Sequence, residues 1–303
     1  MPLASKVRDL DAPDGRPRRA DVAAGRLRDD VVAGSGGVGA SVTVAEPTGK
    51  LVPAGYDGRF RTSATVLESP AHGPQLCYYV MDSLPPQCEG LDIAGWKWTA
   101  VRHESANGTR WGEYTLVGTY DGEAFRLTEP ATGPSRLRNP GADHLVTPCP
   151  EPEGGWQPVN PDLATDAGLS AAVRRARDVE GSSGVWVDQR IPDDELTEQN
   201  ANDPKRLVLN VTTVGDPEVM EREIRDVWGG ALCVSTAERT MAELRQVQRR
   251  VGDIEGVLSS SIDEVSAQVG VTFLVATEEL QRELDDRYGA GAVRLFGTLE
   301  PID

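Results

Sequence analysis

The chain has 303 residues and a formal net charge of −17, from 31 basic and 48 acidic side chains. Such an acidic surface repels phosphate backbones and anionic lipid headgroups, so we expect no binding to nucleic acid. The longest apolar runs fall far short of the ~20 residues that span a bilayer, so we expect no transmembrane segment.

Residues 1–57 are predicted to form a disordered arm. They are rich in Arg, Asp, Gly and Ala, with Tyr56 as the only aromatic residue, so they offer too little apolar area to offset the entropy of ordering. Within the arm, Gly34-Ser-Gly-Gly-Val-Gly39 matches the glycine pattern of dinucleotide-binding proteins. A β-like stretch follows where such a site needs a helix, and we therefore predict no cofactor.

Residues 58–130 have the alternating polarity of β-strands. Arg59 to Leu67 and Trp111 to Tyr120 alternate, and Asp121-Gly122 separates the second run from another apolar stretch. Asp-Gly between two alternating runs is a strong hairpin signal. We predict a small all-β domain of about five short strands, built as a barrel or a sandwich.

Residues 131–161 are predicted to be a linker. Proline recurs through the segment, and Gly154-Gly155 lies in its middle. A segment of this composition stays extended and semi-rigid.

Residues 162–303 alternate between helical and strand patterns, which predicts an α+β domain with one mixed sheet covered by helices. Helices are predicted over Leu169 to Val179, Asp216 to Trp228, Thr240 to Val251 and Glu278 to Tyr288. Strands are predicted over Val185 to Val187, Leu207 to Val214, Ala231 to Ser235, Val257 to Glu264, Gln268 to Ala276 and Ala292 to Leu299. The whole chain is therefore expected to be of the α+β class.

The four cysteines indicate a compartment. Cys77 and Cys88 enclose a loop bent by a proline pair, which is well suited to closure by a disulfide, and Cys149 with Cys233 is the next pairing we expect. Disulfides favour an extracytoplasmic protein, either secreted or held in the cell envelope. Residues 1–35 show no apolar region of a secretory signal, so a cytoplasmic protein with reduced thiols is the alternative.

The sequence contains no complete metal-binding or nucleophile motif. His72, His103 and His144 lack the close spacing of zinc ligands, and the chain has no C-x-x-C pair. The acidic loop over residues 193–203 departs from the spacing of calcium loops, and Gly181-Ser-Ser-Gly184 lacks the second glycine of a nucleophile elbow. We therefore predict no catalytic, cofactor-binding or metal-binding residues.

Trp96, Trp98 and Trp111, together with Tyr114, are candidates for an aromatic surface that binds sugars or a protein partner. The other interpretation is that they form the core of a small β-domain with few other large apolar side chains. Strand alternation places Trp111 out of phase with Tyr114, so Trp111 is the tryptophan we expect to be exposed if one is.

Distinctive strings occur in two parts of the chain, residues 60–130 and 205–300. They are Thr62-Ser-Ala-Thr-Val-Leu-Glu-Ser69, Pro74-Gln-Leu-Cys77, Leu84-Pro-Pro-Gln-Cys88, Gly95-Trp-Lys-Trp98, Gly112-Glu-Tyr-Thr-Leu-Val-Gly-Thr-Tyr-Asp-Gly122, Val227-Trp-Gly-Gly-Ala-Leu-Cys233 and Arg287-Tyr-Gly-Ala-Gly291. These strings resemble an uncharacterised family of actinobacterial proteins that often look exported or lipid-anchored. The resemblance implies an extracytoplasmic location and brings no catalytic residues with it.

These observations favour a non-enzymatic, extracytoplasmic binding or scaffold protein, whose partner is an unknown protein or small molecule. The alternative is a hydrolase or other enzyme with a site at the junction of the two domains. A cavity that brings His103 or His144 beside a Ser, Asp or Glu of residues 162–303 would favour the enzyme. A flat junction with buried tryptophans would favour the scaffold.

Overall fold

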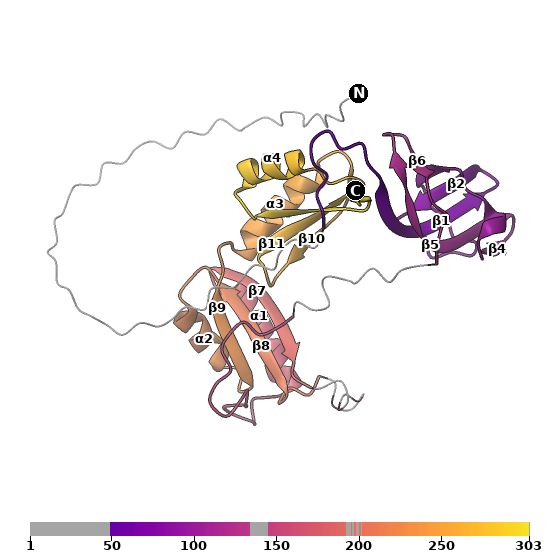
Figure 1. The fold of residues 1–303 in the computed structure, drawn as a ribbon. Helices are drawn as coiled ribbons and strands as arrows, with labels where there is room; N and C mark the ends of the chain where they lie inside the picture. The colour runs from indigo at the N-terminus through magenta and orange to yellow at the C-terminus, as the bar shows by residue number, and fades with distance from the viewer. Residues whose placement is uncertain are drawn as a thin grey trace, which may run out of the picture.

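A computed structural model describes residues 49–133 and 145–302, except residues 192–194, 196, 198–199 and 201. Over these residues the protein is α+β, as predicted, with four α-helices and three β-sheets (Figure 1). None of the helices found there is long and apolar enough to cross a bilayer. The glycine motif, His144 and part of the acidic loop lie outside the described residues.

The largest sheet is built mainly from residues 60–127 and has seven strands. These are β1 (Phe60–Ser69), β2 (His72–Cys77), β3 (Leu91–Ala94), β4 (Glu104–Ala106), β5 (Thr109–Tyr120), β6 (Ala124–Leu127) and β13 (Glu300–Pro301), with a short 3-10 helix η1 (Trp98–Ala100) between β3 and β4. The strand order is β13-β1-β2-β3-β6-β5-β4, and β1 also pairs with β5 along most of its length. The pairings from β1 through β2, β3, β6 and β5 therefore return to β1.

The predicted hairpin between β5 and β6 is present. Tyr120 pairs with Phe125, and the carboxylate of Asp121 accepts hydrogen bonds from the backbone N–H groups of Ala124 (2.9 Å) and Glu123 (3.0 Å). These bonds, led by that from Ala124, lower the pKa of Asp121 because they favour the charged form. The turn is thus fixed by its own aspartate.

The C-terminal end of the chain belongs to the same sheet. β13 pairs antiparallel with the start of β1, and Leu299 is fully buried in one core with Phe60. Val52 is buried in that core as well and forms a parallel bridge to Thr277. Residues 49–57, predicted as the end of the disordered arm, are thus part of the packed structure, whereas residues 1–48 lie outside the described residues.

Residues 166–297 form two smaller sheets where the sequence predicts one, so that prediction is wrong in the number of sheets. The first sheet and its helices are α1 (Asp166–Asp178), β7 (Ser182–Gln189), β8 (Leu207–Thr213), α2 (Pro217–Arg225) and β9 (Ala231–Thr236). The second sheet and its helices are α3 (Met241–Gly252), β10 (Val257–Asp263), β11 (Gln268–Phe273), α4 (Glu278–Tyr288) and β12 (Val293–Gly297). Each sheet is mixed, because its first two strands are antiparallel and its last two are parallel. Every predicted helix and strand of the region overlaps an observed one.

These two units have the same element order, helix-strand-strand-helix-strand, and their sequences align without gaps in two blocks. We call residues 165–236 the first repeat and residues 240–297 the second repeat. In the first block the identical pairs are Thr165/Thr240, Ala167/Ala242, Leu169/Leu244, Arg174/Arg249, Arg175/Arg250, Asp178/Asp253, Glu180/Glu255, Gly181/Gly256 and Asp188/Asp263. In the second block they are Val211/Val271, Thr212/Thr272, Glu218/Glu278, Arg222/Arg282, Glu223/Glu283, Asp226/Asp286 and Gly229/Gly289.

The shared residues fix the same local structure in both repeats. Thr165 and Thr240 are the N-caps of α1 and α3, and each side chain accepts a backbone N–H from the first helical turn. Gly181 and Gly256 precede the first strands with φ of +84° and +87°, a conformation that favours glycine. The strand register also agrees, so residues 165–297 contain an internal structural repeat.

Residues 145–161, predicted as part of an extended linker, pack against the first repeat, and we call them the covering segment. Cys149 is bonded to Cys233 of β9. Thr147 donates its backbone N–H and its hydroxyl to the carboxylate of Asp188 in β7, at 2.9 and 2.7 Å. The segment thus covers one face of the sheet instead of spanning free space.

Candidate functional site

The predicted aromatic cluster contributes to the core of the largest sheet. The ring of Trp96 packs edge-to-face on Trp98 and on Tyr114, with centroids 5.2 and 5.0 Å apart. Trp98 and Tyr114 are buried, and Trp96 is half-buried against the same core. Edge-to-face pairs stabilise packing beyond the area they bury, so these rings support the fold directly.

The polar edge of Trp98 is bonded to neighbouring side chains. Its indole N–H donates to one carboxylate oxygen of Glu68 at 2.5 Å, and Arg110 donates to the other at 2.8 Å. The Arg110 guanidinium lies 5.7 Å from the Trp98 ring centroid, and the exposed His103 ring packs on the indole at 5.0 Å. The donor of Trp98 is therefore already used within the protein.

Trp111 lies on the other side of β5. It is half-buried and stands directly opposite Leu67 in the continuous register of β1 and β5, with Tyr114 on the alternate face. The alternation inferred from sequence therefore describes this strand correctly. Its partner Leu67 is fully buried, which indicates that Trp111 shields that side chain.

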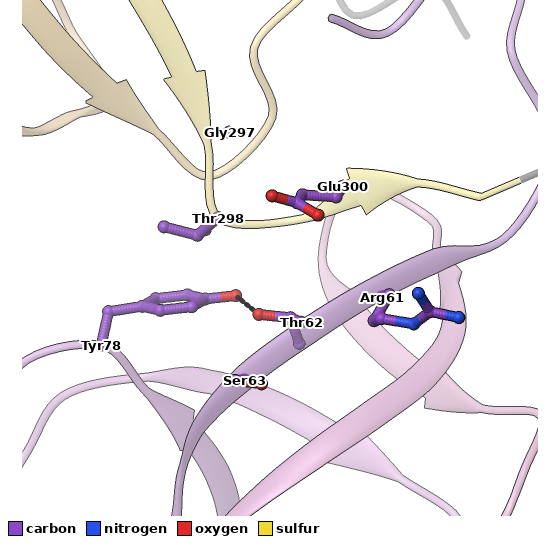
Figure 2. Close-up of a pocket in the computed structure, with 7 residues that line it drawn as sticks. All are labelled: Arg61, Thr62, Ser63, Tyr78, Gly297, Thr298 and Glu300. Carbon is purple, nitrogen blue, oxygen red and sulfur yellow. Dashed lines mark hydrogen bonds between the residues drawn. The ribbon is translucent and has the colours of Figure 1, made fainter. Parts of the chain in front are cut away.

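A small pocket lies at the junction of the largest sheet and the end of the second repeat (Figure 2). Its volume is about 180 Å³, and it is lined by Arg61, Thr62, Ser63, Tyr78, Gly297, Thr298 and Glu300. The hydroxyls of Tyr78 and Thr62 lie 3.3 Å apart. Burial raises the pKa of Tyr78 to about 12, so at neutral pH the phenol is uncharged and its O–H is a hydrogen-bond donor.

Neither of the two histidines that the structure describes, His72 and His103, lines this pocket. His103 lies in the aromatic cluster and is not among the lining residues of the pocket, and His144 lies outside the described residues. Within the described ranges, no group of three His, Cys, Asp or Glu side chains is arranged to hold a metal ion.

Both expected disulfides are present. The Cα atoms of Cys77 and Cys88 are 6.1 Å apart, and those of Cys149 and Cys233 are 5.8 Å apart. Both separations lie within the range that a disulfide spans. Two disulfides in one chain are typical of an oxidising, extracytoplasmic environment.

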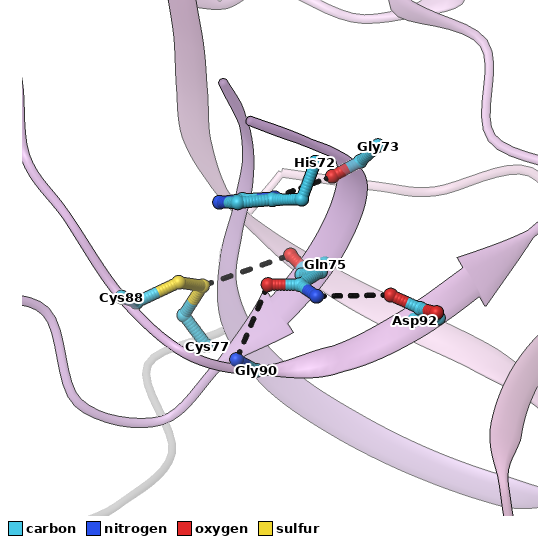
Figure 3. The surroundings of a disulfide bond; sticks show 7 residues. All are labelled: His72, Gly73, Gln75, Cys77, Cys88, Gly90 and Asp92. Atoms are coloured by element: carbon cyan, nitrogen blue, oxygen red, sulfur yellow. Dashed lines mark hydrogen bonds between the residues drawn. A yellow bond between two sulfur atoms is a disulfide. The ribbon is translucent and has the colours of Figure 1, made fainter. Parts of the chain in front are cut away.

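The first disulfide closes the loop between β2 and β3 at its base (Figure 3). We call residues 78–87 the disulfide loop. Beside the bond, the Gln75 side chain donates to Asp92 at 2.9 Å and accepts the backbone N–H of Gly90 at 3.3 Å. A Cβ at Gly90 would overlap the backbone of the neighbouring strand, so glycine permits this close crossing.

Hydrogen bonds also hold the loop internally. The backbone N–H of Met81 donates to the carbonyl of Gln87 at 2.8 Å. Ser83 donates its backbone N–H to the carbonyl of Met81 (2.8 Å) and its hydroxyl to the carbonyl of Pro85 (2.9 Å). The loop therefore has a defined shape up to its tip.

Large apolar side chains of the disulfide loop stand in solvent. The exposed fractions are 61% for Tyr79, 65% for Met81 and 80% for Leu84. A shallow groove of about 460 Å³ runs beside Tyr79 and Met81, and it is lined by Tyr79–Met81 and Gln87–Glu89. Exposed apolar side chains that are close together are characteristic of interaction surfaces.

The spacing of the cysteines and prolines predicts this loop but not its apolar surface. A signal was present, because Tyr79 to Met81 is an apolar run inside a closed loop. Because such a run belongs to no amphipathic helix or strand, its side chains are not directed into a core by the local structure.

Neither a scan against protein-family models nor a search of curated proteins finds a match for this sequence. Function is therefore inferred from the site itself.

Proposed function

We propose that the protein is a non-enzymatic binding or scaffold protein of an extracytoplasmic compartment, secreted or held in the cell envelope. The observation that carries this proposal is the disulfide loop, which holds Tyr79, Met81 and Leu84 exposed on a fixed backbone. The two disulfides support the location, since such bonds persist where thiols are oxidised. The resemblance to actinobacterial proteins that often look exported or lipid-anchored supports it as well.

In this proposal the strands of residues 58–130 form a small barrel that serves as a rigid frame for the loop. The return of the strand pairings from β5 to β1 supports the barrel. The division into this domain and an α+β domain over residues 162–303 is part of the same proposal, except that residues 299–301 belong to the largest sheet and its core.

The test is capture of a partner by the intact, oxidised protein. The protein is immobilised and exposed to an envelope extract of the cells that make it, beside an unrelated protein of similar net charge. We expect saturable retention of a defined component, displaced by soluble protein. Equal retention on both supports would contradict a binding role.

A second candidate is a hydrolase or other enzyme that acts at the junction pocket. The observation that favours it is the meeting of Tyr78, Thr298 and Glu300 around one small cavity. Ester, peptide and glycoside substrates would be offered to the wild type, to Glu300→Gln and to Tyr78→Phe. Turnover by the wild type that both variants lose would favour the enzyme, and no turnover would leave the binding role in place.

A further inference from the structure

Acidic side chains accompany the apolar ones on the disulfide loop. Asp82 lies at the tip and Glu89 beside the groove, and both are exposed. No lysine or arginine occurs in the sequence between Arg61 and Lys97. The loop and its flanking strands β2 and β3 therefore carry negative charge that their own sequence does not neutralise.

We propose that the disulfide loop inserts Met81 and Leu84 into an apolar cleft of a protein partner whose rim carries Arg or Lys side chains. This inference rests on the proposed function and names its surface and its class of partner. The apolar tip supplies the buried centre of the interface. Asp82 and Glu89 supply a charged edge that a basic rim complements, which speeds encounter and sets specificity.

The shape of the loop is already fixed before binding. The Cys77–Cys88 bond joins the two ends of the loop, and the hydrogen bond from the Met81 N–H to the Gln87 carbonyl joins its two sides further along. A loop held in this way loses little conformational entropy when a partner binds, so more of the contact energy appears as affinity.

Two other occupants fit these observations less well. A second copy of the chain would bring Asp82 and Glu89 against an identical acidic loop, between molecules of charge −17. Like charges brought together in this way oppose association. A membrane would draw the same carboxylates towards a surface that is negative wherever anionic lipid is present.

The experiment compares four forms of the full-length, oxidised protein: wild type, Met81→Ser/Leu84→Ser, Asp82→Asn/Glu89→Gln, and the control Val159→Ser. Val159 is 67% exposed and lies in the covering segment, away from the loop in sequence. Circular dichroism and thermal unfolding first establish that all four are folded. Each is then cross-linked to proteins of the envelope extract, and the cross-linked partner peptides are identified by mass spectrometry.

We expect the same envelope protein to be retained by the wild type and by Val159→Ser. The Met81→Ser/Leu84→Ser variant should retain it about tenfold less, as for loss of an interface centre. The Asp82→Asn/Glu89→Gln variant should retain it less, with a weaker dependence on salt. The cross-linked peptides should contain Arg or Lys beside apolar residues.

Three results would overturn the inference in distinguishable ways. Equal retention by wild type and Met81→Ser/Leu84→Ser would show that the partner binds elsewhere, and the proposed function would stand. Retention of no envelope protein by the wild type would contradict both the inference about the disulfide loop and the proposed function. Binding to phosphatidylcholine vesicles, or self-association in the ultracentrifuge, that is lost in Met81→Ser/Leu84→Ser would assign the loop to lipid or to a second copy.

Discussion

The two repeats share one topology but differ in what covers the outer face of the sheet, the face turned away from their own helices. In the first repeat, the outer row Trp186–Asn210–Cys233 is buried. In the second, the equivalent row Ser261–Gly270–Arg294 is exposed or half-buried. The same αββαβ topology can therefore have its sheet covered on both faces, as in the first repeat, or on the helix-bearing face alone, as in the second.

The covering segment accounts for the difference. Cys149 and Trp156 pack on the outer face of the first sheet beside Cys233. The aspartate that the two repeats share, Asp188 in the first and Asp263 in the second, also has different hydrogen-bond partners. Asp188 accepts hydrogen bonds from the covering segment, whereas Asp263 accepts the Ser266 hydroxyl at 2.7 Å and fixes the tight turn after β10.

The largest loss of stability is expected from removing the disulfide that joins the covering segment to β9. Replacing Cys149 and Cys233 with alanine opens a loop with a sequence separation of 84 residues. On the chain-entropy account this destabilises the fold by about 4–5 kcal/mol. Urea unfolding measures the total, and amide hydrogen exchange locates it. We expect faster exchange in β7–β9 and little change in β10–β12, and equal acceleration in both sheets would contradict the comparison.

A second difference lies at the end of the second helix of each repeat, where Trp228 occupies the position of Tyr288. Trp228 is fully buried and its indole N–H donates to the Ala231 carbonyl at 3.0 Å, whereas Tyr288 is half-buried. Trp228→Ala should cost about 3–5 kcal/mol, and Tyr288→Ala about 1 kcal/mol. Denaturant midpoints of the two variants measure the gap, and equal losses would mean that the two cores are equally dense.

The sequence predicts the elements of both repeats well but not the repeat itself. Apolar periodicity identifies α3 and β11 because one face of each is buried in a single core. The connection between the first two strands runs over residues 190–206 in one repeat and 264–267 in the other. This difference shifts the second block of the alignment relative to the first, so no single spacing relates the two halves, and one sheet was predicted instead of two.

The candidate site shows the same limit. Cysteine spacing predicts the disulfide loop because loop closure is a local property. The exposure of Met81 and Leu84 depends on what the rest of the fold leaves uncovered, and so does the burial of Trp98. Neither follows from local pattern, since apolar residues in a small β-region are compatible with either place.

A smaller effect is expected where the repeats touch. Gly184 of β7 faces the backbone of Glu264, and a Cβ on Gly184 would overlap the Glu264 carbonyl. The side-chain carboxylate of Glu264 accepts the backbone N–H of the next residue, Val185, at 2.8 Å. Gly184→Ala should destabilise the protein by about 1–3 kcal/mol by overpacking this boundary. The matched variant Ser259→Ala, at the equivalent position of the second repeat, should stay within about 0.5 kcal/mol. Similar denaturant midpoints for the two variants would show that the backbone around Glu264 shifts to accommodate the added methyl group at little cost in stability.

The smallest expected effect concerns the N-termini of α1 and α3. Thr240 and Glu243 form a capping box, whereas the first repeat has Gly168 at the position of Glu243. The hydrogen bond from the Thr240 backbone N–H, assisted by the Thr240 hydroxyl, lowers the pKa of Glu243. A carboxylate with a lowered pKa in the folded state adds stability above its unfolded pKa of about 4.3, and this is lost as pH falls through the folded value.

Glu243→Gln keeps an acceptor at this position but removes the titration. We therefore expect the wild type to lose more stability than Glu243→Gln between about pH 7 and pH 3, with amide exchange changing at the start of α3 and not at the start of α1. Thr240→Ala, which removes the cap itself, should cost about 1 kcal/mol at neutral pH. Because the many other carboxylates are common to both proteins, the difference between the two pH profiles isolates Glu243. Identical profiles would mean that the charge of Glu243 adds no stability to the start of α3, and that the box acts through its hydrogen-bond geometry alone.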